Sequence, residues 1–399
     1  MQLATAYQHP MVLILCVWIC FVSVTCAKKT CNVLDYGAKA DKQTDIGPPL
    51  LKAYADCLKA TTGRPEDTIV LIPQGDFSLK SNVLFAKGKG LTFTFNGQIH
   101  LAYNSRYTGN MIAFTRCQNL VVNGVGAFHG YGDLYRPGGN LNHLPQRPRL
   151  VRFENCQDVD YSGFNLFDAP LYHLVVALGT NFRIHNFRIS STNIGATDGI
   201  DVSGTNIHVH DVDIKTGDEC VTAKSPMKGL LVERVSCINT DGCSIGSFGA
   251  SGKGYIVEDV LYRHVNLTNA SNGVVVKTYS SSQGTIRNIT FTDFILDNVA
   301  YPIKFDYTWG ETLHKTKRNI GSSYGSQKWT DAKFINFRGT GSKYRPLVTL
   351  HCSPRSPCTH FKFQNIQLQG SVEEPSISSA CGTVDNLSRK VLKNSLPGC

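Results

Sequence analysis

The chain has 399 residues, 42% of them hydrophobic and 18% charged, and it carries a formal net charge of +10. A chain of this length can form two or three average domains or one long repetitive β domain. The positive charge favours polyanionic partners. No dense Lys/Arg run or aromatic-basic motif indicates nucleic-acid binding, and an acidic polysaccharide fits the charge equally well.

The N-terminus predicts a secretion signal. An apolar run extends from Met11 to Val24, which is shorter than the ~20 residues needed to span a bilayer. Small residues follow it, and cleavage after Ala27 fits a signal peptide over residues 1–27. We therefore expect a secreted, extracellular protein that leaves the membrane after cleavage, with a single domain over residues 28–399. The segment before the run has no Lys or Arg, so an uncleaved anchor is the alternative.

Secretion changes how the cysteines are interpreted. Eleven cysteines remain after the signal is removed, and an odd number leaves at least one thiol unpaired. Close pairs form disulfides in an oxidising compartment, which predicts Cys31–Cys57, Cys220–Cys237, Cys352–Cys358 and Cys381–Cys399. Three thiols are then expected to be free and buried, those of Cys117, Cys156 and Cys243. A zinc site is the alternative, but the Cys and His spacings that it needs are absent.

The chain after the first cysteine predicts a helix followed by repeats. Residues Pro49 to Lys59 are expected to form a short amphipathic helix that caps the N-terminal end of the fold and is held by Cys57. One pattern then recurs, in which an Asn or Gly opens a short alternating strand and a second short apolar strand follows. Copies begin at Asn119, Asn181 and Asn206.

The spacing of these copies predicts the fold class. The apolar residue near the start of each central copy is Phe182, Ile207, Leu230 or Ile256, at steps of 25, 23 and 26 residues. A drifting period in the twenties without intervening helices is typical of a solenoid. Each copy would form one coil of an all-β, single-stranded parallel β-helix, with apolar side chains stacked inside. A β-sandwich is the alternative, but it does not require copies that align in both strands.

Two acidic clusters lie about one coil apart, the first at Asp198 and Asp201 and the second at Asp218 and Glu219. In a solenoid they would stack on neighbouring strands, which are ~4.8 Å apart. Like charges this close raise one another's pKa, so one carboxyl can stay protonated as an acid while another stays ionised as a base. Cleavage of a glycosidic bond needs this combination, although acidic loop residues are more often simply solvated.

Four motifs then match a known family in order and spacing: Asp198-Gly-Ile-Asp, Gly217-Asp-Glu-Cys, Asp241-Gly-Cys-Ser-Ile-Gly-Ser and Val275-Val-Lys-Thr. Through them, residues 31 to 370 resemble the family 28 glycoside hydrolases, the polygalacturonase family. The resemblance implies a right-handed parallel β-helix that hydrolyses its substrate with inversion and needs no cofactor or metal. Inversion predicts that the acid and base carboxyls lie roughly 6.5–9.5 Å apart.

The resemblance also implies roles for individual residues. Matched motif to motif, it places the general acid at Asp218 and the carboxylates that activate water at Asp198 and Glu219. It places substrate binding at Lys277 and Tyr307, and we expect Asp201 to bind substrate as well.

The departures from polygalacturonases indicate the substrate. Glu219 replaces an Asp of that family, Asp241 a His, Val275 an Arg and Ala196 an Asn. The rhamnogalacturonan hydrolases of the same family share the Asp-Glu pair and lack the His and Arg, and the run 200–226 resembles them. Arg binds carboxylates bidentately, but an Arg that faces neutral rhamnose would be a buried charge without a partner. Val275 suits the methyl group of rhamnose.

We therefore expect a monomeric hydrolase of the α-1,2 galacturonate–rhamnose linkages in the rhamnogalacturonan I backbone of pectin, an acidic plant cell-wall polysaccharide. A polygalacturonase with unusual site residues, a catalytically inactive pectin-binding β-helix and a Ca²⁺-dependent lyase are the alternatives. His208 and His210 share a strand face, and we interpret them as an ordinary outer pair because no third metal ligand is near. Glycosylation is predicted, if the host glycosylates, at Asn266, Asn269, Asn288 and Asn386.

Overall fold

The computed structural model describes residues 28–370, except 145, 250–253, 310–324 and 354. In chain order its strands are β1 (Lys29–Asn32), β2 (Thr68–Ile72), β3 (Asp76–Leu79), β4 (Val83–Ala86), β5 (Lys89–Phe95), β6 (Gln98–Leu101), β7 (Asn110–Thr115), β8 (Gln118–Asn123), β9 (Ala127–His129), β10 (Arg149–Glu154), β11 (Gln157–Ser162), β12 (Asn165–Phe167), β13 (Leu174–Ser190), β14 (Ile200–Lys215), β15 (Val221–Ile238), β16 (Cys243–Phe248), β17 (Tyr255–Thr268), β18 (Asn272–Thr278), β19 (Gly284–Val299), β20 (Tyr301–Asp306), β21 (Gln327–Gly341), β22 (Val348–His351) and β23 (Lys362–Gln369).

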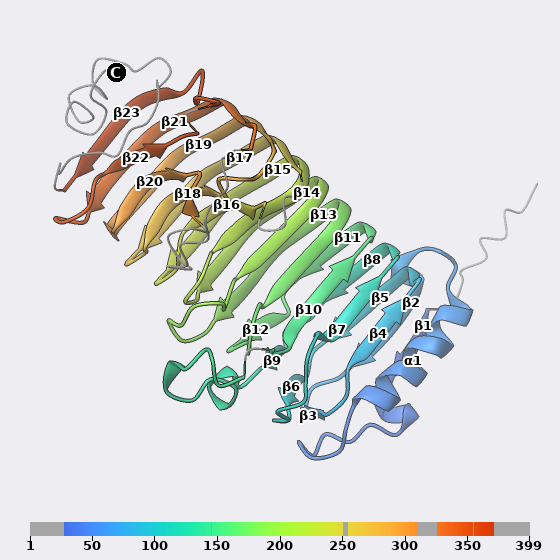
Figure 1. Ribbon diagram of the computed structural model, residues 1–399. Helices are drawn as coiled ribbons and strands as arrows, with labels where there is room; N and C mark the ends of the chain where they lie inside the picture. Colours follow the sequence, from blue (N-terminus) through green and yellow to red (C-terminus); the bar gives the residue numbers. More distant parts are fainter. Residues whose placement is uncertain (1–27, 145, 250–253, 310–324, 354, 371–399) are drawn as a thin grey trace, which may run out of the picture.

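These strands stack as successive coils along one long axis (Figure 1). Each pairs in parallel with the strand one coil before or after it, and 23 strands join into one continuous sheet. In the longest coils a single strand turns a corner and belongs to two faces, as β13, β14 and β15 do. The expected parallel β-helix is therefore confirmed.

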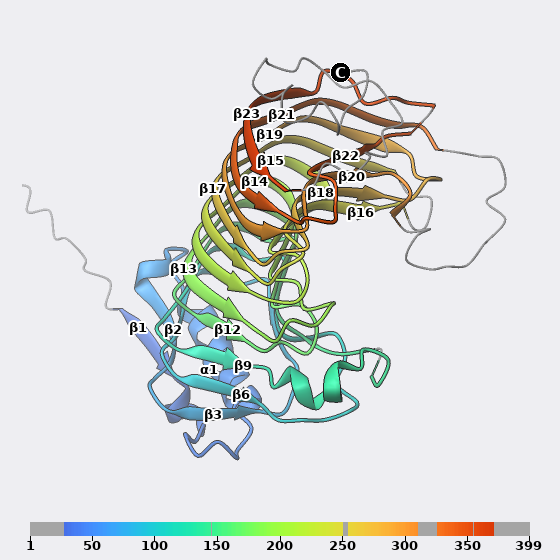
Figure 2. The ribbon, with the colours of Figure 1, turned by 90° about the vertical axis from the view of Figure 1, so that its left-hand side faces the viewer.

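One face of the solenoid is separate from the others, as Figure 2 shows for its later coils. It runs from β4, β7 and β10 through the first residues of β13, β14 and β15 into β16, β18, β20 and β22. We call this sheet the site face, because the acidic clusters of the sequence lie on it. Each step along it moves by one strand, or ~4.8 Å.

The Asn residues that open the coils have a physical role. Asn181 and Asn206 adopt φ of 54°, the left-handed conformation that Asn tolerates better than most other residues. The amide of Asn206 donates to the side-chain oxygen of Asn181 at 2.8 Å, so the turns stack as well as the strands. Inside, Phe182, Ile207 and Leu230 are register partners in the core.

The expected register is wrong in the next coil. Leu230 pairs with Val260 rather than with a residue at Ile256, and Ile256 is 46% exposed. The step from Leu230 to its partner is longer than the expected 26 residues, and Asp259 takes the left-handed position with φ of 57°. An Asp in place of Asn or Gly was the signal that the repeat analysis missed.

The N-terminal end is covered by the expected helix. Helix α1 (Gly47–Ala60) buries Leu50, Ala53 and Cys57 against the first coils. Pro48 and Pro49 lie in its first turn. The first N–H groups of a helix have no partner within it, so the missing N–H of proline removes no helical hydrogen bond there. Four short 3-10 helices, η1 (Val33–Tyr36), η2 (Pro65–Asp67), η3 (Gly132–Leu134) and η4 (Pro137–Gly139), complete the described helical elements.

Three expected disulfides are present, Cys31–Cys57, Cys220–Cys237 and Cys352–Cys358, while Cys381–Cys399 lies outside the described residues. The expectation that Cys117 and Cys156 are free is wrong, because they form a disulfide across a sequence separation of 39 residues. They lie on adjacent coils with Cα atoms 4.5 Å apart, so stacking brings together cysteines that are distant in sequence. Cys243 is a free, buried thiol as expected.

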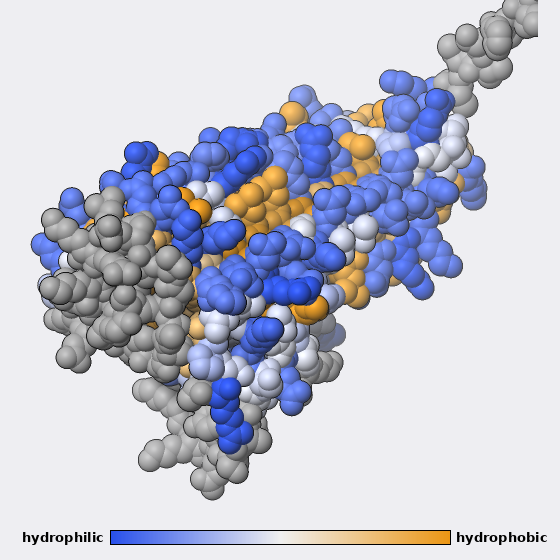
Figure 3. All heavy atoms as spheres, turned by 90° about the horizontal axis from the view of Figure 1, so that it is seen from above, coloured by the Kyte–Doolittle hydropathy of each residue, from blue (hydrophilic) through white to orange (hydrophobic). Residues whose placement is uncertain are grey.

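The surface is mostly polar. Figure 3 shows hydrophilic residues over most of the face seen from above, with apolar side chains between them along the long axis. Asn266, Asn269 and Asn288 are exposed, and their glycosylation stays a prediction, as does that of Asn386, which the structure does not describe. No helix within the described ranges is long and apolar enough to cross a membrane. The proposed signal peptide lies outside these ranges.

Candidate active site

Three carboxylates meet at the turns that lead into β14 and β15. The amide of Gly199 donates to the carbonyl of Glu219 at 2.8 Å, so Asp198 lies beside Glu219 on the next coil. Asp218 precedes Glu219 in the same turn. One oxygen from each of Asp198, Asp218 and Glu219 lies within 4.8 Å of the others. The coil spacing thus brings the three expected catalytic residues together.

This cluster is tight. One oxygen of each carboxylate lies within 4.8 Å of the others, whereas the expected acid–base separation of roughly 6.5–9.5 Å refers to whole carboxyl groups and stays a prediction. The architecture explains the close approach of the oxygens. Asp198 and Glu219 are one strand spacing apart, about 4.8 Å, and Asp218 and Glu219 are neighbours in the chain.

Asp218 is the most accessible of the three carboxylates. It is partly exposed, whereas Asp198 and Glu219 are buried. Its two oxygens accept hydrogen bonds from the backbone amides of Ala196 and Glu219. Ala196 has φ of 58°, so the turn before β14 takes a left-handed residue to direct that amide at Asp218. The loop therefore fixes the carboxylate in the position that faces solvent.

Burial controls the charge of the two aspartates on the first coil. Asp198 is 4% exposed, and burial together with the nearby Asp201 and Asp218 raises its pKa well above its usual value. Burial also raises the pKa of Asp201, against the effect of Lys224. Within the described residues, one oxygen of Asp198 and one of Asp201 have no hydrogen-bond partner. Buried oxygens of this kind are available to a water molecule or a sugar hydroxyl.

Lys277 neutralises Glu219. It extends from β18, and its ammonium forms an ion pair with the Glu219 carboxylate. The ammonium also lies 4.6 Å from the centroid of the Trp309 ring, a distance typical of a cation–π contact. Burial lowers the pKa of Lys277, although Asp218 and Asp198 oppose this shift. The ion pair favours the ionised form of Glu219.

Lys224 is a site residue that the sequence reasoning did not single out. Its ammonium lies 3.5 Å from a carboxylate oxygen of Asp201 and donates to the carbonyl of Gly246 at 2.8 Å. Burial opposes its charge, but Asp201 and Asp198 raise its pKa overall. The sequence did contain a signal for Lys224. It follows Asp218 by six residues within the run 200–226, and alternation along β15 directs it to the same face.

The remaining expected residues lie further along the site face. Tyr307 follows β20 and is 6% exposed, with its ring 4.6 Å from that of His351. Asp241 precedes β16, and its amide donates to the carbonyl of Asp218 at 2.8 Å. Val275 lies in register between Ser244 of β16 and Lys304 of β20. Tyr307 and Asp241 are therefore outside the three-carboxylate cluster.

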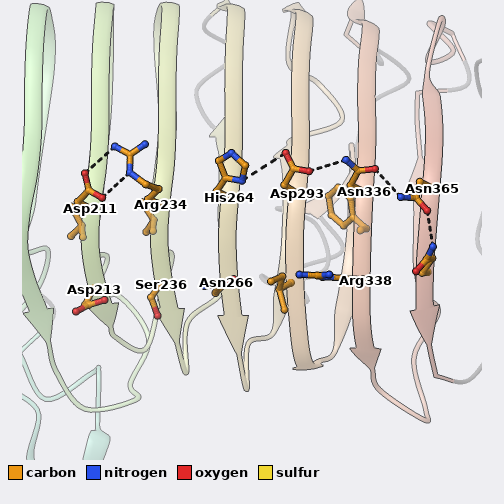
Figure 4. A pocket seen from close by; sticks show the side chains of 15 residues that line it. Asp211, Asp213, Arg234, Ser236, His264, Asn266, Asp293, Asn336, Arg338 and Asn365 are labelled. Atoms are coloured by element: carbon orange, nitrogen blue, oxygen red, sulfur yellow. Dashed lines mark hydrogen bonds and ion pairs between the residues drawn. The ribbon is translucent and has the colours of Figure 1, made fainter.

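A groove of about 980 Å³ lies on another face, along β14, β15, β17, β19, β21 and β23 (Figure 4). It contains none of the three carboxylates. Its side chains largely bind each other, as Arg234 does with both oxygens of Asp211 at 2.8 and 2.9 Å. His208 and His210 also make ion-pair contacts on neighbouring positions, to Glu233 and Asp211. These contacts describe a polar ladder between coils, and they do not assemble catalytic groups.

Comparisons with known proteins agree with this geometry. A protein of Aspergillus niger named "Putative rhamnogalacturonase D" is 33% identical over 368 residues, covering 90% of this chain and 77% of its own length. Rhamnogalacturonase A of Emericella nidulans is 33% identical over 344 residues, covering 85% of this chain and 63% of its own. The chain thus spans between about two thirds and three quarters of the length of these relatives.

Solved structures share the fold. An endo-xylogalacturonan hydrolase from Aspergillus tubingensis matches with a TM-score of 0.77 at 21% identity, over 89% of this chain and 98% of its own. An exopolygalacturonase from Thermotoga maritima matches with a TM-score of 0.71 at 20% identity, over 86% and 87%. Both identify the fold as a right-handed parallel β-helix. The family model of glycosyl hydrolases family 28 matches residues 63–389, and the chain therefore belongs to the family 28 glycoside hydrolases.

Proposed function

We propose that this glycosidase hydrolyses the α-1,2 galacturonate–rhamnose linkages of rhamnogalacturonan I. The observation that carries the proposal is the intact trio of Asp198, Asp218 and Glu219 beside a neutral Val275. The retained acid and base groups argue against an inactive homologue. The missing Arg at Val275 argues against polygalacturonan, which has a carboxylate on every sugar. The names of the two fungal relatives point to the same substrate.

Each of the three carboxylates has its own role in the proposed hydrolysis. Asp218, the accessible group, gives its proton to the glycosidic oxygen as the bond to the anomeric carbon breaks. A water molecule attacks that carbon and gives its proton to Glu219, which the ion pair with Lys277 keeps ionised. Burial and the neighbouring carboxylates raise the pKa of Asp198, which keeps a proton in the cluster. Asp198 would thus supply a proton to the cluster in addition to its expected role at the attacking water.

Two lysines, one buried and one partly exposed, balance the negative charge of the site. Lys224 faces Asp201, and Lys277 faces Glu219. Both ammonium groups are positioned to bind hydroxyl or carboxylate oxygens of the sugars next to the cut. Asp201, with one unpartnered oxygen, would accept a hydrogen bond from a sugar hydroxyl.

The test is incubation of the purified protein with rhamnogalacturonan and with polygalacturonan, followed by product analysis. We expect rhamnogalacturonan to be cut far faster, with rhamnose at each new non-reducing end. Equal or reversed rates would reject the substrate assignment and favour a polygalacturonase.

The same assay decides between hydrolysis and metal-dependent elimination. The three carboxylates are close enough to hold a cation, but Lys277 already neutralises one of them. We expect EDTA to leave the rate unchanged and no ultraviolet-absorbing unsaturated sugar to appear. A loss of rate in EDTA together with such a product would identify a lyase.

A further inference from the structure

The site face continues past the carboxylates as a row of register partners that are buried as far as Val275, which is 3% exposed, and that first become accessible at Lys304. Thr222, Ser244, Val275 and Lys304 are register partners on β15, β16, β18 and β20. The neighbours of Val275 on its strand belong to the hydrophobic core. Since successive residues of a strand point to opposite faces, Val275 and Lys304 point outward on adjacent coils.

The ammonium of Lys304 has more hydrogen-bond donors than its contacts within the protein use. Its side chain is 24% exposed, and its ammonium lies 3.5 Å from the nearer Asp306 oxygen, which is longer than a good charge-assisted hydrogen bond. It also lies 5.0 Å from the ring centroid of Tyr301. An ammonium has three donors, so these contacts position the group without occupying it fully.

A second cation lies at the same ring. The guanidinium of Arg345 is 5.6 Å from the centroid of Tyr301, and Arg345 is exposed. Tyr301 thus holds two positive groups at one end of the site face. Two cations held near one ring suit an acidic sugar, because they can bind its carboxylate.

The patch is within electrostatic reach of the catalytic cluster. Burial raises the pKa of Asp241, and Lys304 opposes that shift. The Asn272 amide donates to the Asp241 carbonyl at 3.1 Å, and Asn272 pairs in register with Tyr301. The patch therefore begins one coil beyond Asn272 on the same side of the molecule as Asp218.

We propose that Lys304, with Arg345, binds the galacturonate carboxylate of the second sugar on the leaving side, one coil beyond the rhamnose that contacts Val275. This inference rests on the proposed function. One coil advances ~4.8 Å, comparable to one sugar of an extended chain, so adjacent coils contact adjacent sugars. The polymer alternates neutral and acidic sugars, and Val275 and Lys304 present a neutral and a cationic side chain in the same order.

The test measures binding without turnover. Asp218→Asn protein and the Asp218→Asn, Lys304→Gln double variant are titrated calorimetrically with rhamnogalacturonan oligosaccharides and with the same oligosaccharides after reduction of their carboxyl groups. We expect the second change to weaken binding of the acidic ligand about 10-fold, the worth of one charge-assisted hydrogen bond. Binding of the carboxyl-reduced ligand should stay the same in both proteins.

Two further variants separate a specific contact from a folding defect. Lys304→Arg keeps the charge and should keep the preference for the acidic ligand. Lys333→Gln, at an exposed position of β21, removes a lysine from another face and should change neither affinity. Unfolding temperatures of all variants check that they fold.

The outcomes distinguish the two proposals. If Lys304→Gln leaves the preference for the acidic oligosaccharide intact, the subsite assignment is rejected, whether or not the enzyme cuts rhamnogalacturonan. If the preference is lost but the native protein does not cleave this polymer, the subsite stands as a binding site for uronates and the proposed function is rejected.

Discussion

Among the three clustered carboxylates, only Asp218 combines partial exposure with two backbone hydrogen-bond donors. Partial exposure suits a general acid, because the group must reach the leaving oxygen. The two amides hold the carboxyl group in place, but by themselves they favour its ionised form. Asp198 lies behind it and is buried. Its raised pKa keeps a proton at the site at a pH where an exposed carboxyl would lose it.

We predict that Asp218→Asn lowers kcat on rhamnogalacturonan by about 10²–10⁴-fold, the usual contribution of general acid catalysis. The amide keeps the shape of the side chain but cannot protonate the leaving oxygen, so KM should change little. Initial rates of reducing-end release measure both constants.

Asp241→Asn is the matched control, because it removes a carboxyl from the next coil without touching the cluster. Its effect should be milder. Near-full activity in Asp218→Asn would show that another residue is the acid and would undermine the roles transferred from the family.

At the scale of the element, a disulfide begins directly after Asp218 and Glu219, the proposed catalytic pair. Cys220 follows Glu219 and is joined to Cys237 at the other end of β15, across a sequence separation of 17 residues. Cys352 and Cys358 close a shorter loop of separation 6, beyond β22. The two disulfides thus differ in loop length and in distance from the catalytic turn.

We predict that Cys220→Ala with Cys237→Ala lowers the free energy of unfolding by about 3 kcal/mol, against about 2 kcal/mol for the Cys352 and Cys358 pair. The chain-entropy model gives this order because longer loops lose more freedom when closed. Only the first double variant should also lose activity. Chemical denaturation and rate measurements test both points, and non-reducing peptide mapping that found Cys220 joined to Cys243 would contradict the assignment.

Contacts within a coil were easier to predict from sequence than contacts between coils. Alternation and Asn-opened turns predicted the solenoid, and short separations predicted the pair Cys220–Cys237. Cys117–Cys156 could not be predicted in this way, because its partners meet only once the register of two coils is known. The wrong register prediction at Ile256 has the same cause, because loop lengths between coils leave no periodic signal in the sequence.

The candidate site shows the same difference between contacts that sequence spacing predicts and contacts that it does not. Asp198, Asp218 and Glu219 could be grouped from a spacing close to one coil, and the structure brings them together. The pairing of Lys277 with Glu219 and of Lys224 with Asp201 depends on side chains that cross between coils. Their distances follow from strand spacing and rotamer, which residue order alone does not contain.

At the scale of the whole molecule, the regular stacking of coils makes the site a linear array. Successive strands of the site face carry one register partner each, from Asp201 through Thr222, Ser244 and Val275, which are buried, to Lys304, which is partly exposed. A linear polysaccharide laid along this face would meet one coil per sugar. Under the proposed function, a change on a single coil, such as a Val in place of an Arg, would alter the preference at a single sugar.

The same regularity places the carboxylates close together, which makes the stereochemistry of hydrolysis an open test of the mechanism. Retaining enzymes have carboxyl separations of ~5–5.5 Å, and the oxygens here lie within 4.8 Å. A covalent intermediate is therefore the alternative to attack by water. Direct attack is nevertheless unfavourable, because Glu219 is 3% exposed and engaged by Lys277, and Asp198 is 4% exposed.

We predict inversion, with a water molecule held at the unpartnered oxygen of Asp198 and deprotonated by Glu219. A water molecule is small enough to reach an anomeric carbon that these buried side chains cannot. Proton NMR of the first products should show the anomeric configuration opposite to that of the substrate, before mutarotation mixes the two forms. Retained configuration in the earliest spectra would assign the role of nucleophile to Glu219 or Asp198. In that case the amide variant of the nucleophile, Glu219→Gln or Asp198→Asn, should block formation of the glycosyl-enzyme intermediate, whereas under inversion no such intermediate is trapped in any variant.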